Sequence, residues 1–252
     1  MLFDELSNIE IWFIITILFI IRYGILAGMF FYIFYVWKKK SLYRFKIQSR
    51  FPLINQIKQE IKYSIMTFII YGSTIWIFLY WIENNKTKLY TDINDYGMAY
   101  FFISIILMVL LHDTYFYWTH RLIHYPKIFK HIHKIHHSFH SPTPWAAFAF
   151  HPIEAIISIG IIPIILFLIP YHQFSLLIFI SFLTLYNIFI HLGFVIPGIW
   201  YFKYQNTTMD HDYHHHRSHC NYGLYFNFWD RLMGTYYPKG RMKYKNDILT
   251  SS

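Results

Sequence analysis

The stretch YGMAYFFISIILMVLLHDTYFYWTHRLIH, residues 96–124, decides the fold. From Tyr96 to Trp118 it is apolar over more than the roughly 20 residues that cross the hydrocarbon core of a bilayer. His120 and His124 follow, four residues apart, so both imidazoles lie on one face of a helix. The stretch predicts a membrane-spanning helix that delivers two metal-binding side chains to one membrane face.

The composition of the whole chain agrees with a membrane protein. Of its 252 residues, 56% are hydrophobic and only 14% are charged, whereas soluble domains carry roughly a quarter charged residues. The fold class expected is all-α, a polytopic integral membrane helical bundle with a cytoplasmic histidine-rich cap. The net charge of +9 suits basic cytoplasmic loops, so we expect a membrane and no nucleic acid as partner.

Five apolar stretches are long enough to span a bilayer. They are Ile11–Trp37, Ile61–Ile82, Tyr96–Trp118, Ile153–Pro170 and Phe174–Ile196. Arg22 lies inside the first stretch, where a central charge costs about 2.5–3.5 kcal/mol on insertion scales. We therefore expect Arg22 to face the bundle interior or a wet cavity, unless the helix begins after it.

Loop charges set the expected orientation. The loop WKKKSLYRFKIQSR (37–50) carries six positive charges and no acid, which is typical of a cytoplasmic loop. The loop ENNKTKLYTDIND (83–95) carries two lysines and three acidic residues, which suits the opposite side. Five crossings then bring almost every histidine to the cytoplasmic face. The expected organisation is N-terminal transmembrane helices in 1–110 and a catalytic region with a transmembrane hairpin in 111–252, forming one structural unit.

Three histidine clusters and one isolated histidine have the spacing of metal ligands. Two clusters have the spacing i, i+3, i+4, one has i, i+4, and each fits a single helical face. The nine candidates are His120, His124, His133, His136, His137, His191, His211, His214 and His215. Nine ligands exceed the four of a zinc site, so the count favours a dinuclear centre. With Cys220 as the single cysteine, a cysteine-based metal site is excluded.

Other polar residues near these clusters admit more than one role. Asp113, two helical turns before His120, is a candidate to accept a hydrogen bond from a metal-binding histidine, or a charge at the end of the helix. Glu154 is equally open. Residues 115–118, all aromatic, either line the substrate entrance or form an interfacial belt. We expect His140, His216 and His219 to be accessory or solvated.

The residues from Leu111 to Pro238 resemble the fatty acid hydroxylase/sterol desaturase superfamily of membrane di-iron enzymes. The resemblance is carried by HDTYFYWTHRLIHYPKIFKHIHKIHH (112–137), SPTPWAAFAFHP (141–152), HLGF (191–194), HDYHHHRSHCNYG (211–223) and FWDRLMGTYYP (228–238). The motifs look most like lathosterol-oxidase-type sterol desaturases and their bacterial relatives, although the last one is shared with sphingoid-base hydroxylases.

The resemblance implies that the nine histidines hold two Fe²⁺ ions, with molecular oxygen as co-substrate. It leaves open whether Asn187, where some members carry a histidine, or His151 contributes. The implied activity is sterol desaturation or lipid hydroxylation. Alternatives are a fatty-acid, sphingoid-base or carotenoid hydroxylase of the same superfamily, or a zinc-dependent membrane hydrolase, which would need an activating glutamate that no HExxH motif supplies. A haem carrier and a metal transporter fit less well, because the histidines cluster at helix ends.

Partners and location follow from the same features. The substrate would be a sterol, fatty acyl or related lipid in the bacterial inner membrane or the endoplasmic reticulum. The chain shows no flavin or dinucleotide motif, so a separate electron donor, such as cytochrome b5 or a ferredoxin, is expected. Its docking would use the basic residues of the histidine-rich face, Lys127, Lys130, Lys134, Lys239, Arg241, Lys243 and Lys245.

Overall fold

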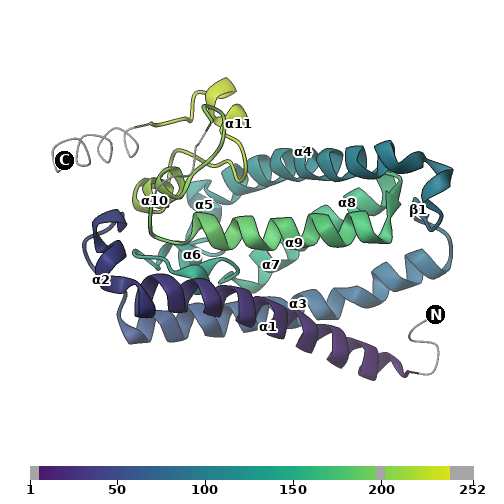
Figure 1. The fold of residues 1–252 in the computed structure, drawn as a ribbon, viewed down its shortest axis with the longest axis horizontal. Helices are drawn as coiled ribbons and strands as arrows, with labels where there is room; N and C mark the ends of the chain where they lie inside the picture. Colours follow the sequence, from purple (N-terminus) through teal and green to yellow (C-terminus); the bar gives the residue numbers. More distant parts are fainter. Residues whose placement is uncertain (1–5, 197–201, 239–252) are drawn as a thin grey trace.

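The computed structural model describes residues 6–196 and 202–238 and confirms the all-α class (Figure 1). Long helices run side by side, and most of the short ones gather at one end. The long helices are α1 (Asn8–Phe31), α3 (Ile54–Glu83), α4 (Gly97–Ile123) and α9 (Gln173–Ile190). The expected docking residues Lys239, Arg241, Lys243 and Lys245, and the rest of 239–252, lie outside the described residues.

The helix α1 begins at a capping box, in which the Ser7 hydroxyl accepts from the Glu10 backbone N–H and the Glu10 carboxylate accepts from Ser7. It continues through a π-helical segment, Tyr32–Trp37. This segment ends with a hydrogen bond from the Lys38 N–H to the Ile33 carbonyl, five residues back. The first predicted span is therefore confirmed over its whole length.

The helix α3 begins seven residues before the predicted span, at Ile54. The added turns carry Glu60, which is fully buried and accepts hydrogen bonds from the Thr143 hydroxyl (2.5 Å) and the Gln56 amide (2.7 Å). Because these donors satisfy the carboxylate, the helix continues beyond its apolar part. α3 thus braces the loop 141–152 that precedes α7.

The prediction of one helix over 153–170 is wrong. The chain forms two short helices there, α7 (Pro152–Ile159) and α8 (Ile161–Leu168), which meet at Gly160. Pro163 has no N–H for the carbonyl four residues earlier, which breaks the helical ladder. Beside the break, the Tyr115 hydroxyl donates to the Ile157 carbonyl (2.5 Å), and a side chain at position 160 would collide with this hydroxyl.

The remaining elements connect the long helices. At the far end, β1 (Leu89–Tyr90) pairs in parallel with β2 (Tyr171–His172) beside the 3-10 turn Ile93–Asp95. At the other end lie α2 (Lys39–Leu42), α5 (Pro126–Phe129), α6 (Lys134–His137), α10 (Thr208–Arg217) and α11 (Phe228–Leu232), with 3-10 turns at Tyr43–Phe45 and Pro144–Ala146.

Within the described residues, four helices are long and apolar enough to cross a membrane: Ile9–Trp37, Ile54–Glu83, Gly97–Ile123 and Gln173–Ile190. Their outward faces expose large apolar side chains, for example Phe102 (57% exposed), Ile106 (58%) and Leu177 (53%). Such a surface suits lipid rather than water. The chain is a multi-pass membrane protein, with α7 and α8 forming a shorter apolar pair inside it.

The basic loop 37–50 lies at the same end of the bundle as the histidines. The Gln48 amide donates to the His140 carbonyl (2.5 Å) and to the Asp212 carboxylate (2.8 Å). The expectation that the basic loop and the histidine-rich segments share one membrane face therefore agrees with the fold.

Candidate metal centre

All nine predicted histidines meet at this end, and they divide into two groups. The five-histidine group contains His120, His124, His133, His137 and His214. The four-histidine group contains His136, His191, His211 and His215. In each group, one nitrogen per ring lies within 4.8 Å of the others.

Two short helices contribute to both groups. On α10, His211 and His215 point to the four-histidine group, whereas His214 points to the five-histidine group. Around α6, His133 and His137 join the five-histidine group and His136 the other. The expectation of one face for each triplet is therefore corrected: the i, i+4 pair serves one group and the third histidine serves its neighbour.

The ring nitrogens within each group lie at the spacing of ligands on one ion. The Nε2 atoms of His120 and His133 are 3.1 Å apart, and those of His137 and His214 are also 3.1 Å apart. In the four-histidine group, His191 Nε2 is 3.0 Å from His211 Nε2. Two imidazole nitrogens bound at about 2.1 Å and at right angles lie about 3.0 Å apart, so both groups fit a metal ion.

The surroundings of Nδ1, the second ring nitrogen, show whether two close Nε2 atoms share a proton or face a common metal ion. His120 Nδ1 lies 2.8 Å from the Tyr222 carbonyl oxygen, and His133 Nδ1 lies 2.7 Å from Glu154 Oε1. The Tyr222 carbonyl oxygen can only accept, so His120 Nδ1 carries the proton and His120 Nε2 presents a bare lone pair; Glu154, when ionised, imposes the same tautomer on His133. Two bare lone pairs 3.1 Å apart repel each other unless a cation lies between them. This juxtaposition is the strongest sign of a metal site.

Burial keeps these rings neutral. It lowers the pKa of His137 to about 3 and of His191 to about 4, and that of His214 well below its ordinary value, with the neighbouring imidazoles adding to the effect. Neutral imidazole is the form that binds metals. An all-imidazole set suits iron, zinc, copper or nickel.

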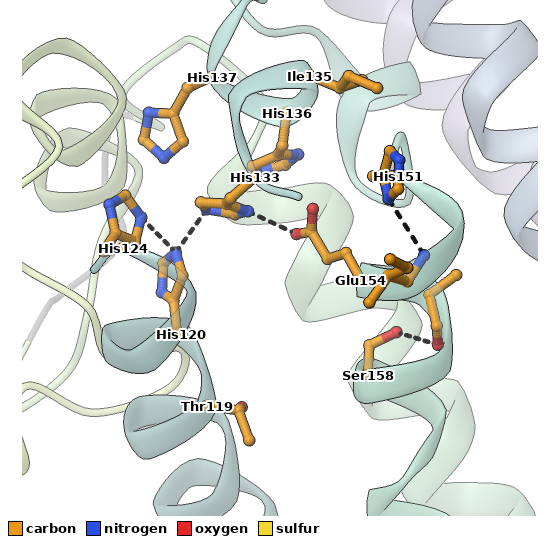
Figure 2. Close-up of polar contacts among 12 residues, drawn as sticks. Thr119, His120, His124, His133, Ile135, His136, His137, His151, Glu154 and Ser158 are labelled. Atoms are coloured by element: carbon orange, nitrogen blue, oxygen red, sulfur yellow. Dashed lines mark hydrogen bonds and ion pairs between the residues drawn. The ribbon is translucent and has the colours of Figure 1, made fainter. Parts of the chain in front are cut away.

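The two buried carboxylates considered on sequence, Glu154 and Asp113, have different hydrogen-bond partners. Glu154, at the start of α7, accepts from His133 Nδ1 and so orients a histidine (Figure 2). Asp113 was considered on sequence as a partner of a metal-binding histidine or as a charge at the helix end. Its Oδ1 accepts from the backbone N–H groups of Tyr225 (2.9 Å) and Phe226 (3.1 Å). Asp113 therefore holds the C-terminal segment against α4.

The remaining polar candidates lie around the groups. His151 caps α7 by accepting from the Ile153 N–H (3.2 Å) and points away from the five-histidine group (Figure 2). Asn187 donates to the Ala147 carbonyl (2.6 Å), and its own carbonyl accepts from His191 Nδ1 (2.8 Å). The expected bystanders His140, His216 and His219 are exposed.

The C-terminal motif supports the site through backbone groups that sequence reasoning missed. Asp230 accepts from the Tyr222 (2.9 Å) and Gly223 (2.8 Å) N–H groups, which fixes the carbonyl that holds His120. The Cys220 carbonyl accepts from His214 Nδ1 (2.7 Å). Backbone carbonyls leave no residue signature in a sequence. The one sign of this support is that the segment around Asp230 resembles a family motif.

Two adjoining cavities lie beside the histidines. The histidine pocket is lined by His120 and His133 of one group and by His136, His191 and His211 of the other. The apolar cavity adjoins it between the long helices. The two share the lining residues His112, Phe116, Phe150, Ser158 and Asn187.

The four aromatic residues 115–118 divide between the two roles considered on sequence, lining the substrate entrance and forming an interfacial belt. Tyr115 and Phe116 line the histidine pocket. Tyr117 is fully buried and stacks on Trp229, while Trp118 is 43% exposed on the outer surface. The first two are thus placed to touch a bound molecule, and the last suits an interfacial position.

Comparisons with known proteins point to one family. A profile of the family described as "Fatty acid hydroxylase" matches residues 105–235. The chain is 36% identical over 184 residues to the Delta(7)-sterol 5(6)-desaturase ERG3B of Gibberella zeae, covering 73% of this chain and 57% of that protein. It is 33% identical over 188 residues to the lathosterol oxidase of Homo sapiens, covering 73% and 62%. The chain thus spans about three fifths of these relatives' lengths. No solved structure matches it.

Proposed function

Because the chain belongs to the fatty acid hydroxylase family, we propose that it is a membrane oxidoreductase that oxidises a C–H bond of a lipid with molecular oxygen. The observation that carries the proposal is the pair of buried histidine groups at the inner end of an apolar cavity. The relatives named as sterol desaturases favour a sterol substrate and desaturation; hydroxylation of a sterol, fatty acyl chain or sphingoid base is the alternative.

The metal proposed is iron, with one Fe²⁺ in each group. The five- and four-histidine groups are its ligands, and the chemistry of neutral imidazoles suits Fe²⁺. When bound, the two ions would supply the oxygen activation that C–H oxidation requires, and electrons from the separate donor would restore them to Fe²⁺ after each turnover. A zinc-dependent hydrolase is less well supported, since the sequence has no HExxH motif to supply an activating glutamate.

The protein's own residues would prepare the reaction. Glu154 and the Tyr222 carbonyl hold His133 and His120 in one tautomer, so their Nε2 lone pairs stay directed into the group. Phe116 and Phe150 line both cavities and would exclude water from the reacting carbon. The apolar cavity would orient the lipid, whose hydrocarbon body matches its lining.

We also propose a topology and an assembly. The histidine end would face the cytoplasm because the basic loop 37–50 lies there. A separate cytochrome b5 or ferredoxin would dock on that face, where Lys127, Lys130 and Lys134 are exposed. Residues 1–110 and 111–252 would act as one unit, since Tyr23 of α1 donates to the Pro144 carbonyl (3.1 Å).

Lipid analysis of cells with and without the protein tests the function. We expect a desaturated or hydroxylated lipid that forms only in the presence of oxygen and disappears in the His136→Ala variant. The matched control is His216→Ala, which removes an exposed histidine of the same face. An unchanged lipid profile with the wild-type protein, or full activity of His136→Ala, would overturn the proposal.

A further inference from the structure

Arg22 is a charged residue in the middle of the apolar helix α1. Placing arginine at the centre of a membrane helix costs about 2.5–3.5 kcal/mol, so intramembrane charges usually serve a function and face the interior. The structure places Arg22 on the wall of the apolar cavity, as expected from the sequence. The other lining residues are mostly apolar, including Phe19, Ile75 and Leu183.

The donors of Arg22 are largely unused. Its Nη2 donates to the Thr184 hydroxyl oxygen on α9 (3.2 Å), and that hydroxyl donates in turn to the Ile180 carbonyl (2.8 Å). Arg22 Nε is inaccessible to solvent and has no hydrogen-bond partner. No carboxylate forms an ion pair with Arg22 in the part of the chain that the structure describes. A guanidinium has five N–H donors, so this one is incompletely satisfied. Its charge faces the ring of Phe19, 5.8 Å from the ring centre, rather than an anion.

The residue that Arg22 contacts, Thr184, lies on the same helix face that leads to the histidines. Thr184, Asn187 and His191 follow one another on one face of α9, three and four residues apart. Thr184 and Asn187 line the apolar cavity, and Asn187 and His191 line the histidine pocket. At 1.5 Å per residue, Thr184 lies about 10 Å along the helix from His191. A lipid held at Thr184 and Arg22 would therefore reach the four-histidine group with its hydrocarbon body.

We propose that Arg22 and Thr184 bind the oxygen-bearing head group of the lipid substrate, and that Arg22 thereby determines which lipids are oxidised. This inference rests on the proposed function. The head group is one that accepts hydrogen bonds, either the hydroxyl of a sterol or the carboxylate of a fatty acid. Its oxygen supplies the acceptor that Arg22 lacks, and the distance to His191 selects the carbon presented to the metal centre.

Binding to the metal-free protein in lipid nanodiscs tests the proposal without relying on activity. The probes are a tritiated sterol with one hydroxyl, competed by the same sterol without its hydroxyl, by its methyl ether and by palmitate. We expect the wild type to prefer the hydroxyl over the deoxy sterol by roughly 10- to 100-fold, the factor for a hydrogen bond to a charged group. Arg22→Gln should lose this preference, and Thr184→Val should reduce it by a few fold.

Three controls separate the possible outcomes. Arg44→Gln removes an exposed arginine and should bind as the wild type does. Arg22→Lys keeps the charge and should retain part of the preference, which keeps the test informative if Arg22→Gln does not fold. Stronger competition by palmitate than by the hydroxyl sterol identifies a carboxylate as the preferred head group and supports the proposal.

An unchanged ratio of hydroxyl to deoxy binding in a folded Arg22→Gln variant would overturn the assignment. The proposed function is tested separately, by measuring oxidation of the same lipids by the iron-loaded wild type. If binding discriminates but no lipid is oxidised, the function is wrong and the head-group site stands. If lipids are oxidised with the same KM by wild type and Arg22→Gln, the head-group site is wrong and the function stands.

Discussion

The five-histidine and four-histidine groups consist of the same side chain, but the fold holds their imidazole rings in place by different numbers of hydrogen bonds. In the five-histidine group, oxygen atoms of Tyr222, Glu154, Ser218 and Cys220 lie within hydrogen-bond distance of four Nδ1 atoms. In the four-histidine group, His191 alone has such a partner, the Asn187 carbonyl, and the buried Nδ1 atoms of His136, His211 and His215 have none.

The difference concerns how far each group is organised before metal binds. A hydrogen bond at Nδ1 fixes both the tautomer and the orientation of the ring, and such partners typically contribute 10- to 100-fold to metal affinity. The five-histidine group is therefore prepared for its metal by the fold. The four-histidine group depends more on the metal itself for its order.

The largest effect is expected from removing a ligand of either group. His133→Ala and His136→Ala should each reduce lipid oxidation by more than about 100-fold, because the proposed reaction needs both metals and a lost ligand costs more than a lost partner of a ligand. The measurement is product formation per mole of purified protein. Activity of either variant within tenfold of the His216→Ala control would show that its group is dispensable.

The second effect concerns Glu154, whose carboxylate contacts the five-histidine group alone. Glu154→Gln should weaken metal binding in that group by about 10- to 100-fold and leave the other group unchanged. Metal titration of the metal-free protein resolves the two sites. Asp113→Asn is the matched control, a buried carboxylate that binds backbone instead; equal losses in both variants would contradict the assigned role.

The third effect is the order in which the metals leave. On dilution into a chelator, the four-histidine group should release its metal about tenfold faster, in line with its missing Nδ1 partners. His191→Ala and His133→Ala, each impaired in one group, assign the two kinetic phases. Faster loss from the five-histidine group would reverse the comparison.

The smallest effect is on the pH dependence of stability. His137 and His191 have pKa values of about 3 and about 4 in the folded protein, against an ordinary value of about 6.5. Between pH 6.5 and 4 the unfolded chain binds more protons, so the metal-free protein should lose stability as the pH falls through this window.

Thermal unfolding of the metal-free protein from pH 7.5 to 4.5 measures this loss. The double variant His137→Asn/His191→Asn should show a shallower decline of Tm. A Tm that rises on acidification, or an identical slope in the double variant, would show that these rings do not govern the acid limit.

Much of this arrangement could be predicted from sequence, because histidine spacing and apolar length carry direct physical meaning. All nine grouped histidines, the membrane helices around Tyr96–Trp118 and the inward place of Arg22 were predictable. The division of His133, His136 and His137 between two groups was not, because His133 caps the four-residue helix α6 and the rings turn to different neighbours.

Two further features were hidden for identifiable reasons. The carbonyls of Tyr222 and Cys220 that hold histidines belong to the backbone and have no residue signature. The choice between Asp113 and Glu154 depended on which carboxylate lies against a histidine ring, and helical spacing alone left both open. The break between α7 and α8 at Gly160, by contrast, could have been predicted from Pro163. The apolar length of the stretch suggested one continuous helix instead.

The central claim is that the two groups are separate iron sites. The most direct test is the iron content of the anaerobically purified protein, measured together with its protein concentration. About two iron atoms per chain are predicted, one for each group of four or five ligands. A content of one or fewer after loading with excess Fe²⁺, or stoichiometric zinc that iron does not displace, would contradict it.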